Sequence, residues 1–291
     1  MKLLCSLAAL FALGGAIPLP GPVSAVKWRH GRAVALAGTI DAPVLLVIQG
    51  TAGMRQIEPW RAAAGARRVE VIDFTADREG TVHALLLAVM PAGRDRRLIC
   101  RFPEQGEASC DGLGEPRCRL LAVEAGGAPW CFGEGPAGML LHRLGGPQGG
   151  PRFWLPAEGP LRAAAAARRA WMAAASGRIR LILPELSLMA EVDPESGETR
   201  LIRLPGPAGL SGLESFAVHG DRLLALLPLN TAAAAALKER YGLFELRGGW
   251  RRAAPERDWP RGARLAGAER ETAWIWNRLD RRLERVALPP P

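Results

Sequence analysis

A short pattern recurs along the chain: an apolar strand, a turn that usually contains glycine, and a second apolar strand. Two copies match closely, ASGRIRLILP around Gly177 and VHGDRLLALLP around Gly220, because both have the turn, the apolar run and the proline that ends it. A single hairpin is only marginally stable in water, so we expect the copies to pack against one another. The other copies have their turns near Gly31, Gly80, Gly126 and Arg270.

The spacing of these turns predicts the fold. Successive turns are about 43 to 51 residues apart, which is typical of a β-propeller blade and not of a helical repeat. A second hairpin follows the first in most units. In the fourth unit it has strands near Leu188–Val192 and Thr199–Leu204. We therefore predict an all-β, six-bladed β-propeller with four antiparallel strands per blade. The inner strands are predicted at Val69–Thr75, Arg119–Val123, Ala170–Ala175, Ser215–His219 and Arg264–Ala268.

The last blade is short of strands. After Arg270 only about two more strands fit before Pro291. We expect the segment near Val26–His30 to supply the missing strand and close the ring, because pairing the first and last blades leaves no open sheet edge.

One segment departs from the strand pattern. Residues Asn230–Gly242 begin with a good N-cap residue, continue with an alanine run and end at glycine. We predict a short helix here, between the second and third strands of the fifth blade. The alanine run Ala163–Ala167 is a second place where a helix could replace a strand.

The first 25 residues are typical of a secretory signal peptide. Lys2 precedes an apolar stretch that runs to about Ala16, and Val23, Ser24 and Ala25 form a candidate cleavage site. We expect a mature single-domain propeller from Val26 to Pro291 that is secreted or periplasmic. Because the apolar run is short for a membrane span, we expect no transmembrane segment after cleavage.

Four cysteines cluster in the second and third units: Cys100, Cys110, Cys118 and Cys131. In an oxidising compartment an even number of clustered cysteines favours disulfides. Cys100 and Cys110 flank one turn almost symmetrically, and Cys118 and Cys131 flank another, so we predict these two pairs. Two alternatives stay open: a Cys110–Cys118 bond between the blades, and a metal site, for which no CxxC spacing is present.

The turn Asp193-Pro-Glu-Ser-Gly-Glu after an alternating strand resembles the outer hairpin of bacterial propellers of the NHL and quinoprotein-like kinds. The resemblance extends over the six units and implies the propeller fold. Those families contain both enzymes and binding modules, so it implies no specific activity. Leu201 stands where quinoprotein repeats commonly carry a tryptophan, and we expect no cofactor.

Candidate catalytic residues are few. Ser211 lies in GLSGL, which lacks the final glycine of a GxSxG nucleophile elbow. We interpret the carboxylate pair Glu191 and Asp193 as a solvated strand edge. The histidines are spread over four units without metal-ligand spacing, so we predict no catalytic and no metal-binding residue. They are His30, His83, His142 and His219.

Charge gives the clearest functional indication. The formal net charge is +9, with 38 Lys and Arg against 29 Asp and Glu. Loops from the second to the third strand, and from each blade to the next, share one face of a propeller, and arginines gather in these loops. An anionic partner is therefore expected on that face. The predicted ligand-face residues are Arg67, Arg68, Arg94, Arg96, Arg97, Arg168, Arg169, Arg281 and Arg282.

Two functions remain open from the sequence. The first is a monomeric binding or scaffolding propeller whose loop-rich face binds an envelope protein, an anionic polysaccharide or a lipid head group. Export argues against nucleic acid as the partner. The alternative is a metal-dependent six-bladed propeller hydrolase or lactonase, for which Glu70 and Glu214 are the candidate ligands at the starts of inner strands.

Overall fold

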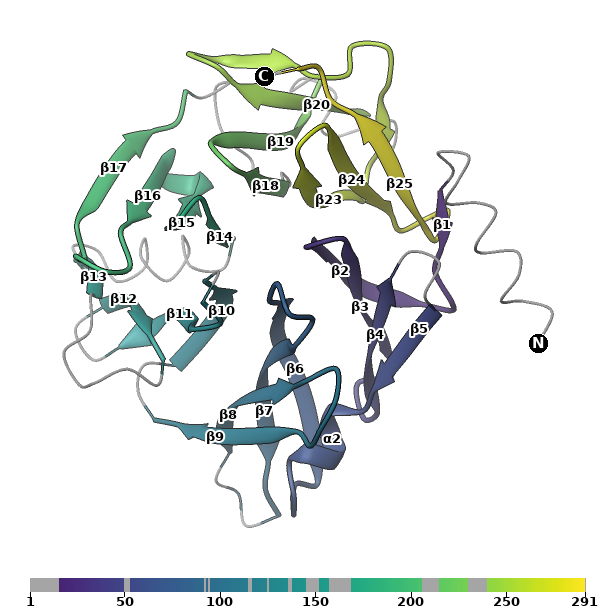
Figure 1. The fold of residues 1–291 in the computed structure, drawn as a ribbon, viewed down its shortest axis with the longest axis vertical. Helices are drawn as coiled ribbons and strands as arrows, with labels where there is room; N and C mark the ends of the chain where they lie inside the picture. The colour runs from purple at the N-terminus through teal and green to yellow at the C-terminus, as the bar shows by residue number, and fades with distance from the viewer. Residues whose placement is uncertain are drawn as a thin grey trace. The chain divides into compact units, whose positions relative to one another are not determined.

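The fold is a six-bladed β-propeller, as predicted (Figure 1). The structure is a computed structural model that describes residues 16–49, 53–91, 93, 95–114, 117–124, 126–135, 138–144, 152–156, 169–205, 215–229 and 240–290. Each blade is a sheet of four strands, and blade 5 has an additional two-residue strand that pairs with its third strand.

The strands follow the order expected for repeated hairpins. Blade 1 contains β2 (Val23–Arg29), β3 (Arg32–Gly38), β4 (Pro43–Gln49) and β5 (Gly53–Ile57). Blade 2 contains β6 (Arg68–Ala76), β7 (Val82–Val89), β8 (Arg96–Phe102) and β9 (Ser109–Leu113). Blade 3 contains β10 (Arg117–Val123), β11 (Pro129–Gly135), β12 (Gly138–Arg143) and β13 (Arg152–Pro156).

The remaining blades repeat this arrangement. Blade 4 contains β14 (Trp171–Ala175), β15 (Arg178–Leu183), β16 (Leu188–Val192) and β17 (Thr199–Arg203). Blade 5 contains β18 (Ser215–His219), β19 (Arg222–Pro228), β20 (Arg240–Leu246), β21 (Trp250–Arg252) and β22 (Trp259–Pro260). Blade 6 contains β23 (Ala263–Glu269), β24 (Thr272–Asn277), β25 (Arg282–Ala287) and β1 (Ile17–Pro18). The five predicted inner strands agree with β6, β10, β14, β18 and β23 to within two residues at each end.

The chain divides into two compact units. The first unit comprises Met1–Gly38, Leu46–Gln56 and Leu213–Pro291, and the second comprises Thr39–Leu45 and Ile57–Gly212. Blades 5 and 6 and most of blade 1 belong to the first unit, and blades 2, 3 and 4 to the second.

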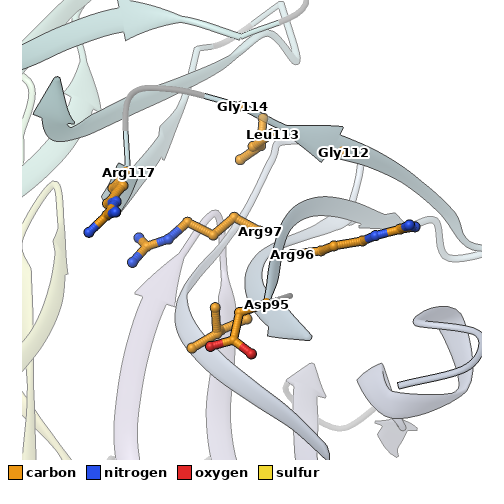
Figure 2. A pocket seen from close by; sticks show the side chains of 8 residues that line it. Asp95, Arg96, Arg97, Gly112, Leu113, Gly114 and Arg117 are labelled. Carbon is orange, nitrogen blue, oxygen red and sulfur yellow. The ribbon is translucent and has the colours of Figure 1, made fainter. Parts of the chain in front are cut away.

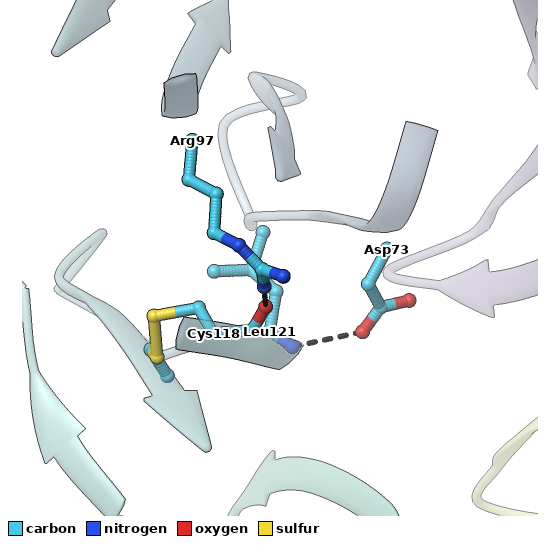
Figure 3. Close-up of a disulfide and its surroundings, with 5 residues drawn as sticks. Asp73, Arg97, Cys118 and Leu121 are labelled. Atoms are coloured by element: carbon cyan, nitrogen blue, oxygen red, sulfur yellow. Dashed lines mark hydrogen bonds between the residues drawn. A yellow bond between two sulfur atoms is a disulfide. The ribbon is translucent and has the colours of Figure 1, made fainter. Parts of the chain in front are cut away.

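In each unit, one pair of neighbouring blades is joined by a buried hydrogen bond from a backbone N–H to a side chain. In the second unit a carboxylate oxygen of Asp73 on β6 accepts a hydrogen bond from the backbone N–H of Leu121 on β10 at 2.8 Å (Figure 3). In the first unit the hydroxyl of Ser215 on β18 accepts one from the N–H of Leu265 on β23 at 2.7 Å. Because a buried polar group without a partner is costly, each bond favours one register between adjacent inner strands.

The strand that completes blade 6 differs from the prediction. Val26–Arg29 belongs to β2, which pairs with β3 through the turn at Gly31. The missing strand is instead β1, where Ile17 lies opposite Leu283 of β25, and the N–H of Leu19 donates to the carbonyl of Arg281 at 3.0 Å. The prediction was wrong because the local hairpin with β3 already uses the Val26 segment.

The predicted helix at Asn230–Gly242 is wrong at its end. Residues 230–239 lie outside the described residues, as does the run Ala163–Ala167, but Arg240–Gly242 begin strand β20. A Cβ on Gly242 would lie 2.8 Å from Leu229 and 2.9 Å from Phe244, so glycine permits close packing here and does not end a helix. Among the described residues, the helical segments are α2 (Pro59–Ala62) and η1 (Pro184–Leu186), and no membrane-spanning helix is found.

Candidate functional site

A cavity of about 700 Å³ opens in the second unit, between strands of blade 2 and the start of blade 3. Three of its eight lining residues are arginines and one is an aspartate, so the lining carries a net positive charge (Figure 2). The lining residues are Leu87, Asp95, Arg96, Arg97, Gly112, Leu113, Gly114 and Arg117.

Strand register explains why Arg97 lies in this cavity. Arg97 on β8 is directly opposite Leu87 on β7 and Leu113 on β9, and directly opposite residues in antiparallel strands share one face of the sheet. The arginine is therefore flanked by two leucines. Its neighbour Arg96 is opposite Ala88 and belongs to the other face. Accordingly, the Arg97 side chain points toward Arg117, and that of Arg96 points away (Figure 2).

The Arg97 guanidinium is half-buried and fixed by a backbone carbonyl. It donates a hydrogen bond to the carbonyl oxygen of Cys118 on β10 at 2.5 Å (Figure 3). Burial lowers the pKa of Arg97, and the like charges of Arg117 and Arg119 lower it further, with partial compensation by Glu134 and Glu70. Arginine stays protonated at neutral pH, so the cavity contains repelling positive charges that a bound anion would relieve.

The two arginines whose charges lower the pKa of Arg97, Arg117 and Arg119, both lie on β10. Arg119 has its Nη2 3.4 Å from a carboxylate oxygen of Glu134. Arg117 is exposed, and within the described part of the chain its side chain has no hydrogen-bond or ion-pair partner. Of the two arginines that point toward each other here, Arg117 is therefore more available to a ligand than Arg97, whose guanidinium is bonded to the Cys118 carbonyl.

Two disulfides hold the strands that carry these arginines. Cys100 and Cys110 are directly opposite on β8 and β9, with their Cα atoms 4.1 Å apart. Cys118 on β10 is bonded to Cys131 on β11 with a Cα–Cα distance of 5.6 Å (Figure 3). Both predicted pairings are confirmed. The expected opposition of the second pair is not, because the turn pairs Val123 with Pro129 and so places Cys131 opposite Leu121, while a bulge between Cys118 and Leu120 places Cys118 opposite Gly133.

The bulge also explains a glycine. Gly133 on β11 lies opposite Cys118, and a Cβ built on it would be 2.3 Å from the carbonyl oxygen of Arg117. Only glycine allows β11 to approach the start of β10 this closely. The position of the Arg117 backbone therefore depends on a residue that has no side chain.

The structure brings together only part of the predicted ligand face. Arg96 and Arg97 line the cavity, whereas Arg94 and Arg168 lie outside the described residues. The other predicted residues lie elsewhere. Arg67 and Arg68 are at the start of β6, Arg169 lies 3.3 Å from Glu185, and Arg281 and Arg282 are at the start of β25 in the first unit.

Sequence reasoning missed Arg117. The inner strand predicted from the sequence begins at Arg119, whereas β10 begins two residues earlier, at Arg117. The signal that could have found it is the alternation Arg117-Cys118-Arg119, which places two arginines on one side of a strand next to a cysteine.

The carboxylate pair on blade 4 is not a solvated edge as predicted. Glu191 is 9% exposed and accepts a hydrogen bond from Nε of Arg180, itself 5% exposed, at 2.6 Å. The edge interpretation failed because β16 lies between β15 and β17. Asp193, by contrast, accepts backbone N–H bonds in the turn from Glu195 at 2.9 Å and Ser196 at 3.0 Å.

The other candidate catalytic residues that the structure describes do not lie together in a catalytic arrangement. His83 is buried, with Nε2 2.9 Å from the carboxylate of Asp77, and burial lowers its pKa. Ser211 and Glu214 lie outside the described residues, and Glu70 is exposed on β6. In the described part of the chain, no group of three or more His, Cys, Asp or Glu residues is arranged to hold a metal ion.

No protein-family model matches the chain, and no curated protein matches it. Among solved structures, a catalytically inactive virginiamycin B lyase from Staphylococcus aureus with quinupristin is similar, with a TM-score of 0.50 and 11% identity over 94% of this chain and 98% of the lyase. The SapL1 lectin in complex with alpha methyl fucoside has a TM-score of 0.49 and 12% identity over 94% of this chain and 99% of the lectin. At these identities the likeness to the lyase supports the propeller fold alone.

Proposed function

We propose that this protein is a secreted or periplasmic binding propeller that holds an anionic ligand in the arginine-lined cavity of blades 2 and 3. The observation that carries the proposal is the convergence of Arg97 and Arg117, from two different blades, on one cavity (Figure 2). Two disulfides support the export part of the proposal, because such bonds persist in oxidising compartments.

The lining also favours one chemical class of ligand. A guanidinium fork pairs well with a carboxylate, sulfate or phosphate. Leu87 and Leu113, on either side of Arg97, offer apolar contact to the face of a ring. A volume of about 700 Å³ lies in the usual range of small-molecule sites. We therefore propose an acidic saccharide that carries a carboxylate on its sugar ring.

The test is a calorimetric titration with oligogalacturonate, with a neutral maltooligosaccharide of equal length as the comparison. We expect the acidic ligand alone to bind, and binding to weaken from 0.1 M to 1 M salt as the Debye length falls from about 10 Å to about 3 Å. Replacing Arg117→Gln removes a charged donor that has no partner among the described residues, so affinity is expected to fall by about tenfold or more without loss of stability.

The matched control is Arg200→Gln on β17, in the same unit. Arg200 is exposed, and no hydrogen bond or ion pair of its side chain is found among the described residues, so both variants lose one positive charge. Equal weakening by the two variants would show that net charge drives the interaction and would overturn the proposed site.

A further inference from the structure

Cleavage after Ala25, as predicted from the sequence, would remove residues that belong to the structure of the first unit. Residues before Ala25 are part of its sheets: Ile17 is 2% exposed opposite Leu283, and Val23 is 8% exposed opposite Ala37. Between them Leu19 is buried and bonded through its N–H to the carbonyl of Arg281.

Cleavage after Ala25 would remove a whole strand and part of another. It would take away β1, which is the fourth strand of blade 6, and the first three residues of the seven-residue β2. β25 would then become an open edge, the feature that native sheets normally protect. A leader that is removed is not expected to contain strands of the mature fold.

A second candidate cleavage site, also made of small residues, lies directly before β1. Gly14, Gly15 and Ala16 directly follow the apolar stretch Leu3–Leu13, and Lys2 precedes that stretch. A leader of 16 residues with this order of segments falls within the usual range of signal peptides. The residue after Ala16 is Ile17, the first residue of β1.

We propose that a signal peptidase cleaves this chain between Ala16 and Ile17, so that the mature protein begins with the strand that completes blade 6. Hydrolysis of that peptide bond consumes one water molecule, and it leaves a carboxylate on Ala16 and an amino group on Ile17. Export, one part of the proposed function, is required for this step, whereas the arginine cavity is not.

The experiment is to express the full chain with its own N-terminus in a bacterial secretion host. The exported protein is then analysed by intact mass after reduction and by N-terminal sequencing. An N-terminus at Ile17 is the expected result. An N-terminus at Val26 would overturn the site while leaving export in place. An intact Met1 N-terminus on protein that stays in the cytoplasm would overturn both export and cleavage.

Two variants test the site without depending on correct folding. A bulky residue is not accepted where the peptidase requires a small one. Ala16→Phe is therefore expected to accumulate as a full-length precursor on an immunoblot, and Ala25→Phe to be processed like the unsubstituted chain. The opposite pattern would place cleavage after Ala25 and contradict the proposal.

Discussion

Glu245 on β20 is a buried carboxylate that ties blade 5 to the end of the described chain. It accepts hydrogen bonds from Nε and Nη2 of Arg222 at 2.7 and 2.9 Å, and it lies 3.0 Å from Nη2 of Arg247. Arg222 also donates to the carbonyls of Arg270 and Pro289, both at 3.0 Å. The charge of one glutamate thus orders an arginine that holds two other segments of the first unit.

Replacing Glu245→Gln should therefore destabilise the protein in a pH-dependent manner. Burial would raise the pKa of Glu245, but the hydrogen bonds and charges of Arg222 and Arg247 outweigh it and lower the pKa below its usual value. The ionised form is thus favoured by folding, so its stabilisation is complete above the unfolded pKa and is lost as pH falls through the folded pKa. We expect a loss of about 2–4 kcal/mol in the free energy of unfolding at pH 7, and a smaller one at pH 3, by denaturant titration.

The control for this prediction is Glu134→Gln. The side chain of Glu134 is 50% exposed and its contact with Arg119 is long, at 3.4 Å. Exposed pairs contribute little, so the free energy of unfolding should change by less than about 1 kcal/mol. A Glu245→Gln loss of the same size at both pH values would contradict the ionic origin of its effect.

At the scale of strands and hairpins, the features that the sequence predicted correctly are those that depend on residues close together in the sequence. The turn after β16 was predicted from Asp193 and the residues that follow it, and its hydrogen bonds are made within a few residues. The pairing of Cys100 with Cys110 was predictable for the same reason, because both flank one turn. These features depend on neighbours in the sequence, so alternation and turn residues suffice to identify them.

Features that depend on distant segments could not be predicted in this way. Ile17 pairs with Leu283, and the Arg97 guanidinium bonds to the Cys118 carbonyl of the next blade. Neither partner is indicated by spacing or periodicity. Two residues of the cavity, Arg96 and Arg97, were named from the sequence as part of the loop between the second and third strands of blade 2, but the contribution of Arg117 requires knowledge of how β10 lies against β8.

The disulfide of blade 3 should matter for binding as well as for stability. Cys118 and Cys131 join β10 to β11, and the carbonyl of Cys118 holds Arg97. We expect the double variant Cys118→Ser/Cys131→Ser to lose about 2–4 kcal/mol of unfolding free energy, because a cross-link restricts the unfolded chain. It should also bind oligogalacturonate more weakly, because β10 positions both Arg97 and Arg117. Denaturant unfolding and calorimetric titration measure the two effects.

The comparison for this variant is Cys100→Ser/Cys110→Ser. The two bonds have similar sequence separations, 10 and 13 residues, so similar losses of stability are expected. The blade 2 variant keeps the Cys118 carbonyl in its place and should retain more of the affinity. Unchanged binding in the blade 3 variant would show that this disulfide is not needed to position Arg97 and Arg117.

At the scale of the whole chain, segments from its two ends meet in the first unit. β1 pairs with β25, and the carbonyl of Pro290 accepts a hydrogen bond from Arg247 at 3.0 Å. Blade 1 contacts blade 6 through the stacked rings of Trp28 and Trp274, whose centroids are 3.8 Å apart. The N–H of Gly31 also donates to the carboxylate of Glu269 at 2.7 Å. Bringing together residues so far apart in sequence costs loop-closure entropy, so these contacts depend on the rest of the unit.

A chain that begins at Val26 should therefore be less stable than one that begins at Ile17. It lacks the buried side chains of Ile17 and Leu19, each of which contributes about 1.5–3 kcal/mol on burial. The expected decrease in Tm is about 5–15 °C. It also leaves β25 as an open edge, so we expect concentration-dependent aggregation on heating. Thermal unfolding followed by circular dichroism and light scattering measures both effects.

A Pro20→Ser control, at an exposed position between β1 and β2, should leave Tm nearly unchanged. Equal Tm values for the chains that begin at Ile17 and Val26 would show that β1 contributes nothing to the stability of the first unit, whatever its pairing with β25.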